Sequence, residues 1–146
     1  MDELVNLEFL YVNNNVISSI QGLDSLSNLK ELGIRGNKIQ KIKGLENLTE
    51  LKSLYLMNNN ISIIEGLENL KNLRILDFSG NQISKIQGLE KLENLRLLNL
   101  INNNISSLGN IEQIKTLERL VLRANPVPQN IIDAYKWSKG KLKIFF

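Results

Sequence analysis

The chain of 146 residues contains no cysteine and no histidine, which excludes a disulfide framework, a thiol nucleophile and the usual zinc or iron–sulfur sites. Its net charge is +3, but basic and acidic side chains balance through residue 132, so the body of the chain lacks the cationic surface typical of nucleic-acid binding. No run of 18 apolar residues is present, and the sequence therefore predicts no membrane-spanning helix.

A strong compositional bias, with 27 Leu, 18 Ile and 21 Asn, indicates an internal repeat. Six rows of 22 residues follow one another without insertion or deletion, and Leu occupies the first and fourth places of every row. The sixth and eleventh places are apolar and the ninth is always Asn. The rows start at Leu7, Leu29, Leu51, Leu73, Leu95 and Leu117, and their ninth places are Asn15, Asn37, Asn59, Asn81, Asn103 and Asn125.

The pattern within a row predicts the fold. Its first half alternates apolar and variable residues, which is typical of a short strand with one buried face, and its second half spaces apolar residues by three after a Gly, which suits a helical or 3₁₀ turn. One row cannot bury its apolar residues alone, whereas stacked rows can. We therefore predict an α/β fold: a curved, right-handed solenoid with a parallel sheet on its concave face and short helical or 3₁₀ turns on its convex face.

The repeated Asn is predicted to be structural. The chain turns inward after each strand, where its backbone groups cannot all pair within the sheet. A buried amide has both donors and an acceptor, so it can bond the backbone of its own row and of the next row. We expect all six Asn residues to form such a ladder.

Other columns are also given structural interpretations. Acidic residues follow the Gly-Leu pairs, where they would complement a helix dipole, although an acidic binding stripe is the alternative. These residues are Asp24, Glu46, Glu68, Glu90 and Glu112. Row five carries Gly109-Asn110 in place of the usual Gly, and we expect a local kink there, with Asn110 in a positive-φ conformation.

At the N-terminus the chain starts within a row, with Leu4 on the twentieth place. No polar capping helix precedes it, although solenoid ends normally need a cover. We expect either that the sequence belongs to a longer chain or that another molecule covers this end, and we favour the first. The first residues lack the regions of a secretory signal, which predicts a cytoplasmic protein and makes the glycosylation motifs at Asn47, Asn60 and Asn104 irrelevant.

At the C-terminus the repeats are predicted to end at residue 127, with residues 128–146 forming a cap. Residues 129–137 predict a helix with Ile131, Ile132, Tyr135 and Trp137 on its apolar side, and residues 141–145 predict a strand. A seventh row starting at Lys139 would put Leu142 and Ile144 on its fourth and sixth places. We interpret the tail lysines as protection of an edge strand, with an acidic partner or a lipid surface as the alternative. These are Lys136, Lys139, Lys141 and Lys143.

The rows, of the form L-x-x-L-x-L-x-x-N-x-I-x-x-I-x-G-L-x-x-L-x-x, resemble leucine-rich repeats of the 22-residue subclass over residues 4–127. The type that they resemble most is the regulatory leucine-rich-repeat subunit of protein phosphatase one. Bacterial internalins share the period but prefer Asp and Pro where this chain has Gly-Leu-Glu. The segment from Asn125 also resembles the C-terminal cap of the phosphatase group, without its Leu-Pro and Leu-Asp elements. The resemblance implies protein binding on the concave face.

The third, fifth and seventh places of each strand should face outward on the concave side. We define these positions as the concave wall, which spans roughly 24 Å over six strands. Large apolar residues cluster there into one expected patch, flanked by charges, and Tyr and Arg are types that carry interface energy. The predicted partner-binding residues are Tyr11, Arg35, Tyr55, Met57, Ile75, Asp77, Leu97, Asn99, Ile101, Arg119 and Arg123.

No enzyme is predicted. Asp77, beside Tyr55 and Asn99, is the only polar wall group that suggests chemistry, and no second carboxylate or base accompanies it. We expect no catalytic residue, cofactor or metal. The favoured function is a protein–protein interaction module or scaffold with an unidentified protein partner. The alternatives are a regulatory subunit of a phosphatase or other enzyme, and a structural fragment that self-associates through its uncapped N-terminal row.

Overall fold

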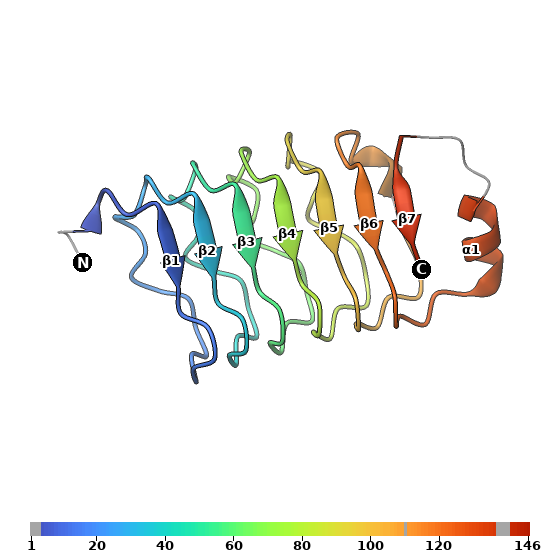
Figure 1. The fold of residues 1–146 in the computed structure, drawn as a ribbon, viewed down its shortest axis with the longest axis horizontal. Coiled ribbons are helices and arrows are strands. Elements are labelled where there is room, and N and C mark those ends of the chain that lie inside the picture. The colour runs from blue at the N-terminus through green and yellow to red at the C-terminus, as the bar shows by residue number, and fades with distance from the viewer. Residues whose placement is uncertain (1–3, 110, 137–140) are drawn as a thin grey trace.

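The computed structural model describes residues 4–109, 111–136 and 141–146, which form a stack of coils (Figure 1). Each coil contributes one three-residue strand, and the seven strands lie side by side in chain order in one parallel sheet. The predicted solenoid with a parallel sheet is confirmed. The strands are β1 (Phe9–Tyr11), β2 (Glu31–Gly33), β3 (Ser53–Tyr55), β4 (Ile75–Asp77), β5 (Leu97–Asn99), β6 (Arg119–Val121) and β7 (Lys143–Phe145).

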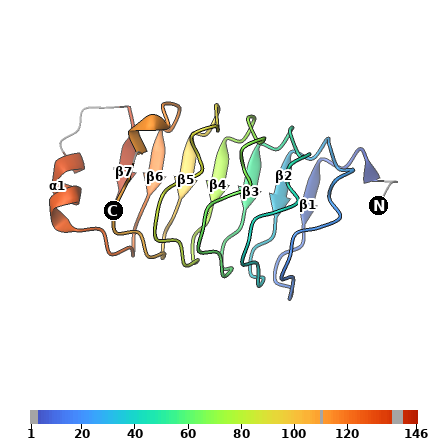
Figure 2. The ribbon, with the colours of Figure 1, turned by 180° about the vertical axis from the view of Figure 1, so that it is seen from behind.

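The exact repeat length sets the register of the sheet. Leu10 pairs with Leu32, which pairs with Leu54, and the same 22-residue step continues to Leu120. Each place of a row therefore stacks on the same place of the next row. The return segments run behind the sheet from each strand to the next (Figure 2). Parallel neighbouring strands require such crossovers.

The convex turns differ from the prediction of helical or 3₁₀ segments. Most coils carry two successive tight turns, in which Leu48 N–H donates to Leu45 O and Leu51 N–H to Leu48 O, both at 3.0 Å. These turns satisfy the spacing of three without continuous helix. Among rows one to six, row five alone has a 3₁₀ helix in the described part of its convex segment, η2 (Ile111–Gln113).

The interpretation of the acidic column as helix caps is wrong for rows one to four, because those turns present no helix end. Of these acids, Glu46 accepts a hydrogen bond from the turn itself, from Gly44 N–H at 3.2 Å. In row five, Gly109 takes the positive φ (+55°) that Gly22, Gly44, Gly66 and Gly88 take in the other rows. Asn110, where we expected the positive φ, lies outside the described residues.

The core is a continuous column of Leu and Ile along the axis of the stack. Leu32, Leu54, Leu76 and Leu98 on the strands are fully buried, as are the residues around them in the middle coils. Phe78, on a sixth place, is the largest fully buried side chain. Burial of this kind is worth about 25 cal/mol per Å² of apolar surface, so stacking supplies most of the favourable free energy of folding.

The ninth-place Asn side chains bond the backbone of two coils. Asn59 Nδ2 donates to Leu56 O at 3.1 Å in its own coil and to Ile34 O at 3.0 Å in the preceding coil, and its Oδ1 accepts from Ile39 N–H at 2.9 Å. The same three bonds recur at Asn37, Asn81, Asn103 and Asn125.

Two details of the predicted ladder are corrected. Each amide bonds the backbone of the preceding row and not of the next row, because its side chain points toward the preceding coil. The row before Asn15 is described only from residue 4 to residue 6, and the Nδ2 of Asn15 reaches only Val12 O and Asn13 O, both at 3.1 Å and both in its own row.

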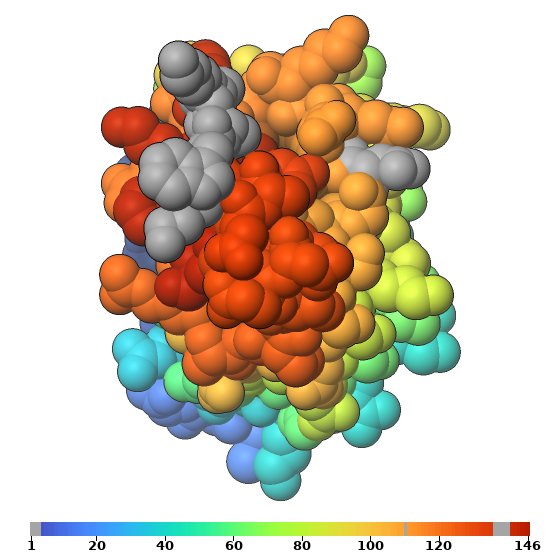
Figure 3. All heavy atoms as spheres, turned by 90° about the vertical axis from the view of Figure 1, so that its right-hand side faces the viewer, coloured from blue at the N-terminus to red at the C-terminus, as the bar shows by residue number. Residues whose placement is uncertain are grey.

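The last coil is closed by α1 (Gln129–Lys136), which covers the end of the stack (Figure 3). Ile131 and Tyr135 pack against the core, as do Ile144 and Phe146 of the terminal segment. Trp137 lies outside the described residues. No helix among the described residues is long and apolar enough to cross a bilayer.

The predicted register of the terminal strand is wrong by two residues. Ile144 pairs with Leu120 and therefore occupies a fourth place, not a sixth, and β7 covers 143–145 instead of 141–145. The α1 segment makes this coil 24 residues long instead of 22. A shift by two keeps every side chain on its expected face, because strand faces alternate with period two.

Candidate protein-binding surface

The strands place the predicted wall residues on one face of the sheet. Along each strand the fourth and sixth places point into the core, and the third, fifth and seventh places face away from it. Tyr55, Met57, Ile75, Leu97 and Ile101 are each half-buried, and Arg35, Arg119 and Arg123 are exposed. Ile75 pairs directly with Leu97, so these two side chains form an apolar ridge across β4 and β5.

A polar cluster interrupts the single apolar patch that the sequence predicted. Asp77 pairs with Asn99 in the register, and Asn99 Nδ2 donates to Asp77 Oδ2 at 2.9 Å. Asp77 Oδ1 also accepts from Ser79 N–H at 2.9 Å and from Ser79 Oγ–H at 2.7 Å. The apolar residues therefore surround a small polar centre, and both oxygens of the Asp77 carboxylate already accept hydrogen bonds.

The N-terminal part of the wall is aromatic. Phe9 and Tyr11 on β1 are 52% and 53% exposed. The Tyr11 ring lies over Gly33, so closely that a Cβ on residue 33 would clash with it. The Tyr11 hydroxyl donates to Glu31 Oε2, and this hydrogen bond to a carboxylate raises the pKa of the phenol above its ordinary value. Gly33 thus provides the space in which Tyr11 reaches Glu31.

The C-terminal part of the wall contains two residues that the sequence analysis did not assign to it. Strand β7 places Lys143 beside Arg119 and Phe145 beside Val121. The Arg119 guanidinium carbon lies 5.4 Å from the centre of the Phe145 ring, within cation–π range. Alternation along 141–145 could have revealed both residues, but they were interpreted only as part of an edge strand.

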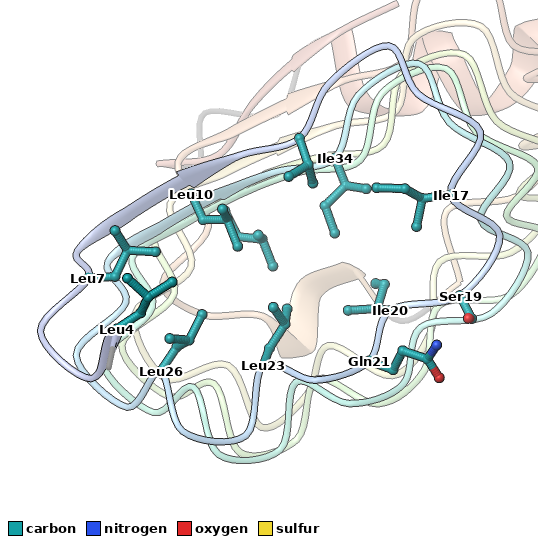
Figure 4. A pocket seen from close by; sticks show the side chains of 12 residues that line it. Leu4, Leu7, Leu10, Ile17, Ser19, Ile20, Gln21, Leu23, Leu26 and Ile34 are labelled. Carbon is teal, nitrogen blue, oxygen red and sulfur yellow. The ribbon is translucent and has the colours of Figure 1, made fainter. Parts of the chain in front are cut away.

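A hollow in the first coil is a second feature of the surface. It has a volume of about 200 Å³, and leucine and isoleucine side chains point into it (Figure 4). Leu4 is 46% exposed beside it, and Leu7 and Leu10 are only partly buried. No segment that the structure describes covers this hollow, whereas α1 covers the other end of the apolar column.

The described side chains offer little basis for catalysis. They include no group of three or more acidic, histidine or cysteine side chains placed to hold a metal ion. Asp77 is engaged by Ser79 and Asn99, and no second acid or base lies within hydrogen-bonding distance of it in the described part of the chain.

Comparison with known proteins identifies the repeats. The family model described as Leucine Rich repeats (2 copies) matches residues 5–49 and 49–91, which together exceed half of the chain. The chain is a leucine-rich repeat protein. Leucine-rich repeat domains commonly mediate protein–protein interactions. The narrower resemblance to the phosphatase regulatory subunit rests on the row sequences alone.

Solved leucine-rich repeat structures share the fold. An internalin, inlF, from Listeria monocytogenes is 31% identical over 99% of this chain and 42% of its own, with a TM-score of 0.83. A leucine-rich repeat protein of Leptospira interrogans is 28% identical over 99% of this chain and 44% of its own, with a TM-score of 0.74. In a TLR13–ssRNA13 complex, the matching chain is 28% identical over 86% of this chain and 19% of its own, with a TM-score of 0.79.

This chain spans less than half the length of each of these structures. No curated protein sequence matches it significantly.

Proposed function

We propose that this leucine-rich repeat chain binds a protein partner on its concave wall. The observation that carries the proposal is the row of half-buried Tyr55, Ile75, Leu97 and Ile101 on a sheet face that no described segment of the chain covers. Large apolar side chains in such a cluster favour an interface, because covering them removes apolar surface from water.

The composition of the wall supports a protein partner over a small molecule. Tyr and Arg are enriched among residues that dominate interface energies, and both occur here around an apolar ridge. The wall is a face about 24 Å across, whereas small-molecule sites are concave pockets that enclose their ligand.

A double substitution tests this proposal. Tyr55→Ala with Ile75→Glu removes an aromatic side chain and places a charge on the ridge, so capture of the partner by the immobilised chain should be lost. The control, Val16→Ala with Ile63→Glu, also shortens one apolar side chain and introduces one negative charge, at side chains that are 76% and 50% exposed off the wall. Circular dichroism establishes that both variants fold. Equal capture by the folded wall variant and the wild type would overturn the proposal.

Self-association is a second candidate, supported by the open apolar hollow at Leu4, Leu7 and Leu10. A second copy that places its own first coil there would extend the buried column. Light scattering over a concentration series tests it: a mass that rises toward that of a dimer supports self-association, and a constant monomer mass rejects it.

A regulatory role on a phosphatase or other enzyme is a narrower form of the first proposal, supported by the Gly-Leu-Glu form of the rows. Phosphatase activity reconstituted with and without this chain tests that role. We also propose an intracellular location, because a chain without Cys has none of the disulfides that secreted domains use. Asn47, Asn60 and Asn104 are exposed, so glycans found on them by mass spectrometry would contradict this location.

A further inference from the structure

We propose that the wall binds an apolar segment of its partner that ends in acidic residues, and that this acidic end lies over β6 and β7. The inference rests on the proposed function, and it adds the chemistry and the orientation of the bound segment. It is carried by a cationic cluster at one end of the wall, which we define as Arg119, Arg123 and Lys143.

The three cations of the cluster lie on adjacent strands. Arg119 and Lys143 are paired in the register, and Arg123 follows β6 on the same face. All three side chains are exposed, and none forms an ion pair with any residue that the structure describes. Cations that face solvent without a partner on a binding wall favour a ligand of opposite charge.

The acidic groups of the chain do not neutralise this cluster. Glu118 borders it, but its carboxylate pairs with Lys141 at 3.1 Å and Arg96 at 3.3 Å. Glu31 lies at the other end of the sheet, where it accepts the Tyr11 hydroxyl. The charges of the wall therefore differ along the stack: Glu31 and Arg35, at β2, are opposite in sign, whereas the three charges at β6 and β7 are all positive.

The guanidinium of Arg119 is also oriented before any partner binds. The guanidinium carbon lies over the Phe145 ring, 5.4 Å from the ring centre, and this cation–π contact favours one position of the side chain. The guanidinium N–H groups can bind a carboxylate through two parallel hydrogen bonds, and a favoured position reduces the rotamer freedom lost on binding.

The spacing of the strands sets the size of the ligand. From Tyr55 on β3 to Phe145 on β7 the sheet spans four intervals of about 4.8 Å, or roughly 19 Å. This distance corresponds to about six residues of extended peptide or 13 residues of helix. A protein segment of this length can contact the apolar ridge and the cluster at once. The continuity of ridge and cluster favours such a segment over a nucleic acid, which would need cationic contacts along its whole path.

Selection from a random 16-residue peptide library displayed on phage tests this inference. Clones are selected on the wild type and measured against the wall variant Tyr55→Ala/Ile75→Glu and the cluster variant Arg119→Glu/Arg123→Glu/Lys143→Glu. The matched control is Lys41→Glu/Lys85→Glu/Lys115→Glu, which makes the same charge change at exposed residues outside the wall. We expect enriched clones that combine apolar residues with Asp or Glu. Both the wall and the cluster variants should bind them at least about tenfold more weakly at low salt, and the control should bind them normally.

The other outcomes distinguish failure of the inference from failure of the proposed function. Clones that lose binding only to the wall variant, with no excess of acidic residues, overturn the inference and leave the proposed function standing. If no selected clone depends on the wall, both are overturned. A 20-nucleotide oligo-dT that binds the wild type more tightly than the selected peptides would overturn the inference in favour of a nucleic-acid ligand.

Discussion

Asn59 illustrates why the ninth place of every row requires an amide. Its Oδ1 accepts from the backbone of the preceding coil while its Nδ2 donates to carbonyl groups of both coils. Asp offers no donor at neutral pH, and Leu offers neither donor nor acceptor. A single side chain thus satisfies buried backbone groups that the strand pairing leaves without partners.

Removing this amide should be costly. Asn59→Ala leaves the buried Ile39 N–H without a partner, at a cost of about 1–3 kcal/mol, and takes one of two amide donors from Ile34 O and from Leu56 O, which keep Asn37 and Asn81. We therefore expect the free energy of unfolding to fall by at least about 2 kcal/mol. Asn15→Ala is the control, because exposed Asn15 bonds only its own coil, and it should cost less than about 1 kcal/mol. Urea unfolding followed by circular dichroism measures both. If both variants lost the same free energy of unfolding, the hydrogen bonds between coils would not be the source of the stability that the Asn ladder provides.

Thr116 is a second residue with a measurable consequence. Its Oγ1 is buried without a hydrogen-bond partner in the described part of the protein. Asn28, Asn72 and Asn94 occupy the same place in other rows, and each donates to a carbonyl of the preceding coil. The threonine side chain is shorter than these asparagine side chains, and its hydroxyl forms no such bond to a described residue.

Thr116→Val should therefore stabilise the protein. Valine keeps the shape of the side chain and removes the unpaired hydroxyl, which is worth about 1 kcal/mol or more when buried. Thr49→Val, at an exposed threonine, is the matched control and should leave the melting temperature nearly unchanged. A lower melting temperature for Thr116→Val, measured by differential scanning calorimetry, would show that the hydroxyl has a partner in solution.

At the scale of elements, the terminal segment is joined to the sheet by charge as well as by strand pairing. Lys141 donates a hydrogen bond to Glu118, and this contact, together with Arg96, holds the pKa of the Glu118 carboxyl below its ordinary value of 4.5. A lowered pKa in the folded state means that the pair stabilises the fold above pH 4.5. This contribution is lost as the pH falls through the lowered pKa.

Glu118→Gln tests that linkage. The wild type should melt at a higher temperature than the variant at pH 7, by a small margin because the pair is exposed to solvent. The difference should disappear as the pH falls below 4.5, and also at high salt, because salt screens exposed charges. A difference that persists unchanged at pH 3 would contradict the role of the ion pair.

The elements also show which features of the fold the sequence can specify. The fixed period of 22 residues determines the strand register completely, since each place stacks on the same place of the next coil. The register of the terminal strand could not be predicted in this way, because the α1 segment lengthens its coil by two residues. The repeat period does not give the length of such an irregular connection. The conformation of the convex turns could not be predicted either, because apolar residues spaced by three suit successive tight turns as well as a 3₁₀ helix.

At the scale of the whole molecule, the same limit applies to the binding surface. Alternation along the strands predicted which side chains face outward, and the predicted wall residues are all half-buried or exposed. It could not predict that Asp77, Ser79 and Asn99 would bond to one another and divide the apolar patch, because those bonds depend on side-chain conformation across strands. The cluster at β6 and β7 likewise emerges only when Lys143 is placed beside Arg119.

The stack as a whole has two unlike ends. At one end α1 covers the core with Ile131 and Tyr135, and at the other no described residue covers the hollow beside Leu4 (Figures 3 and 4). Between them the wall is aromatic toward β1 and cationic toward β7. This asymmetry means that a partner lying along the wall can bind in one direction better than in the other.

The most direct test of binding at the wall is site-specific photo-crosslinking in an extract of the cells that make this protein. Benzoylphenylalanine is incorporated at Tyr55 on the wall or at Ile63, which is 50% exposed off the wall. We predict a partner adduct from position 55 and none from position 63, after equal irradiation of equally folded proteins. Adducts from position 63 alone would contradict the account and place the interface off the wall.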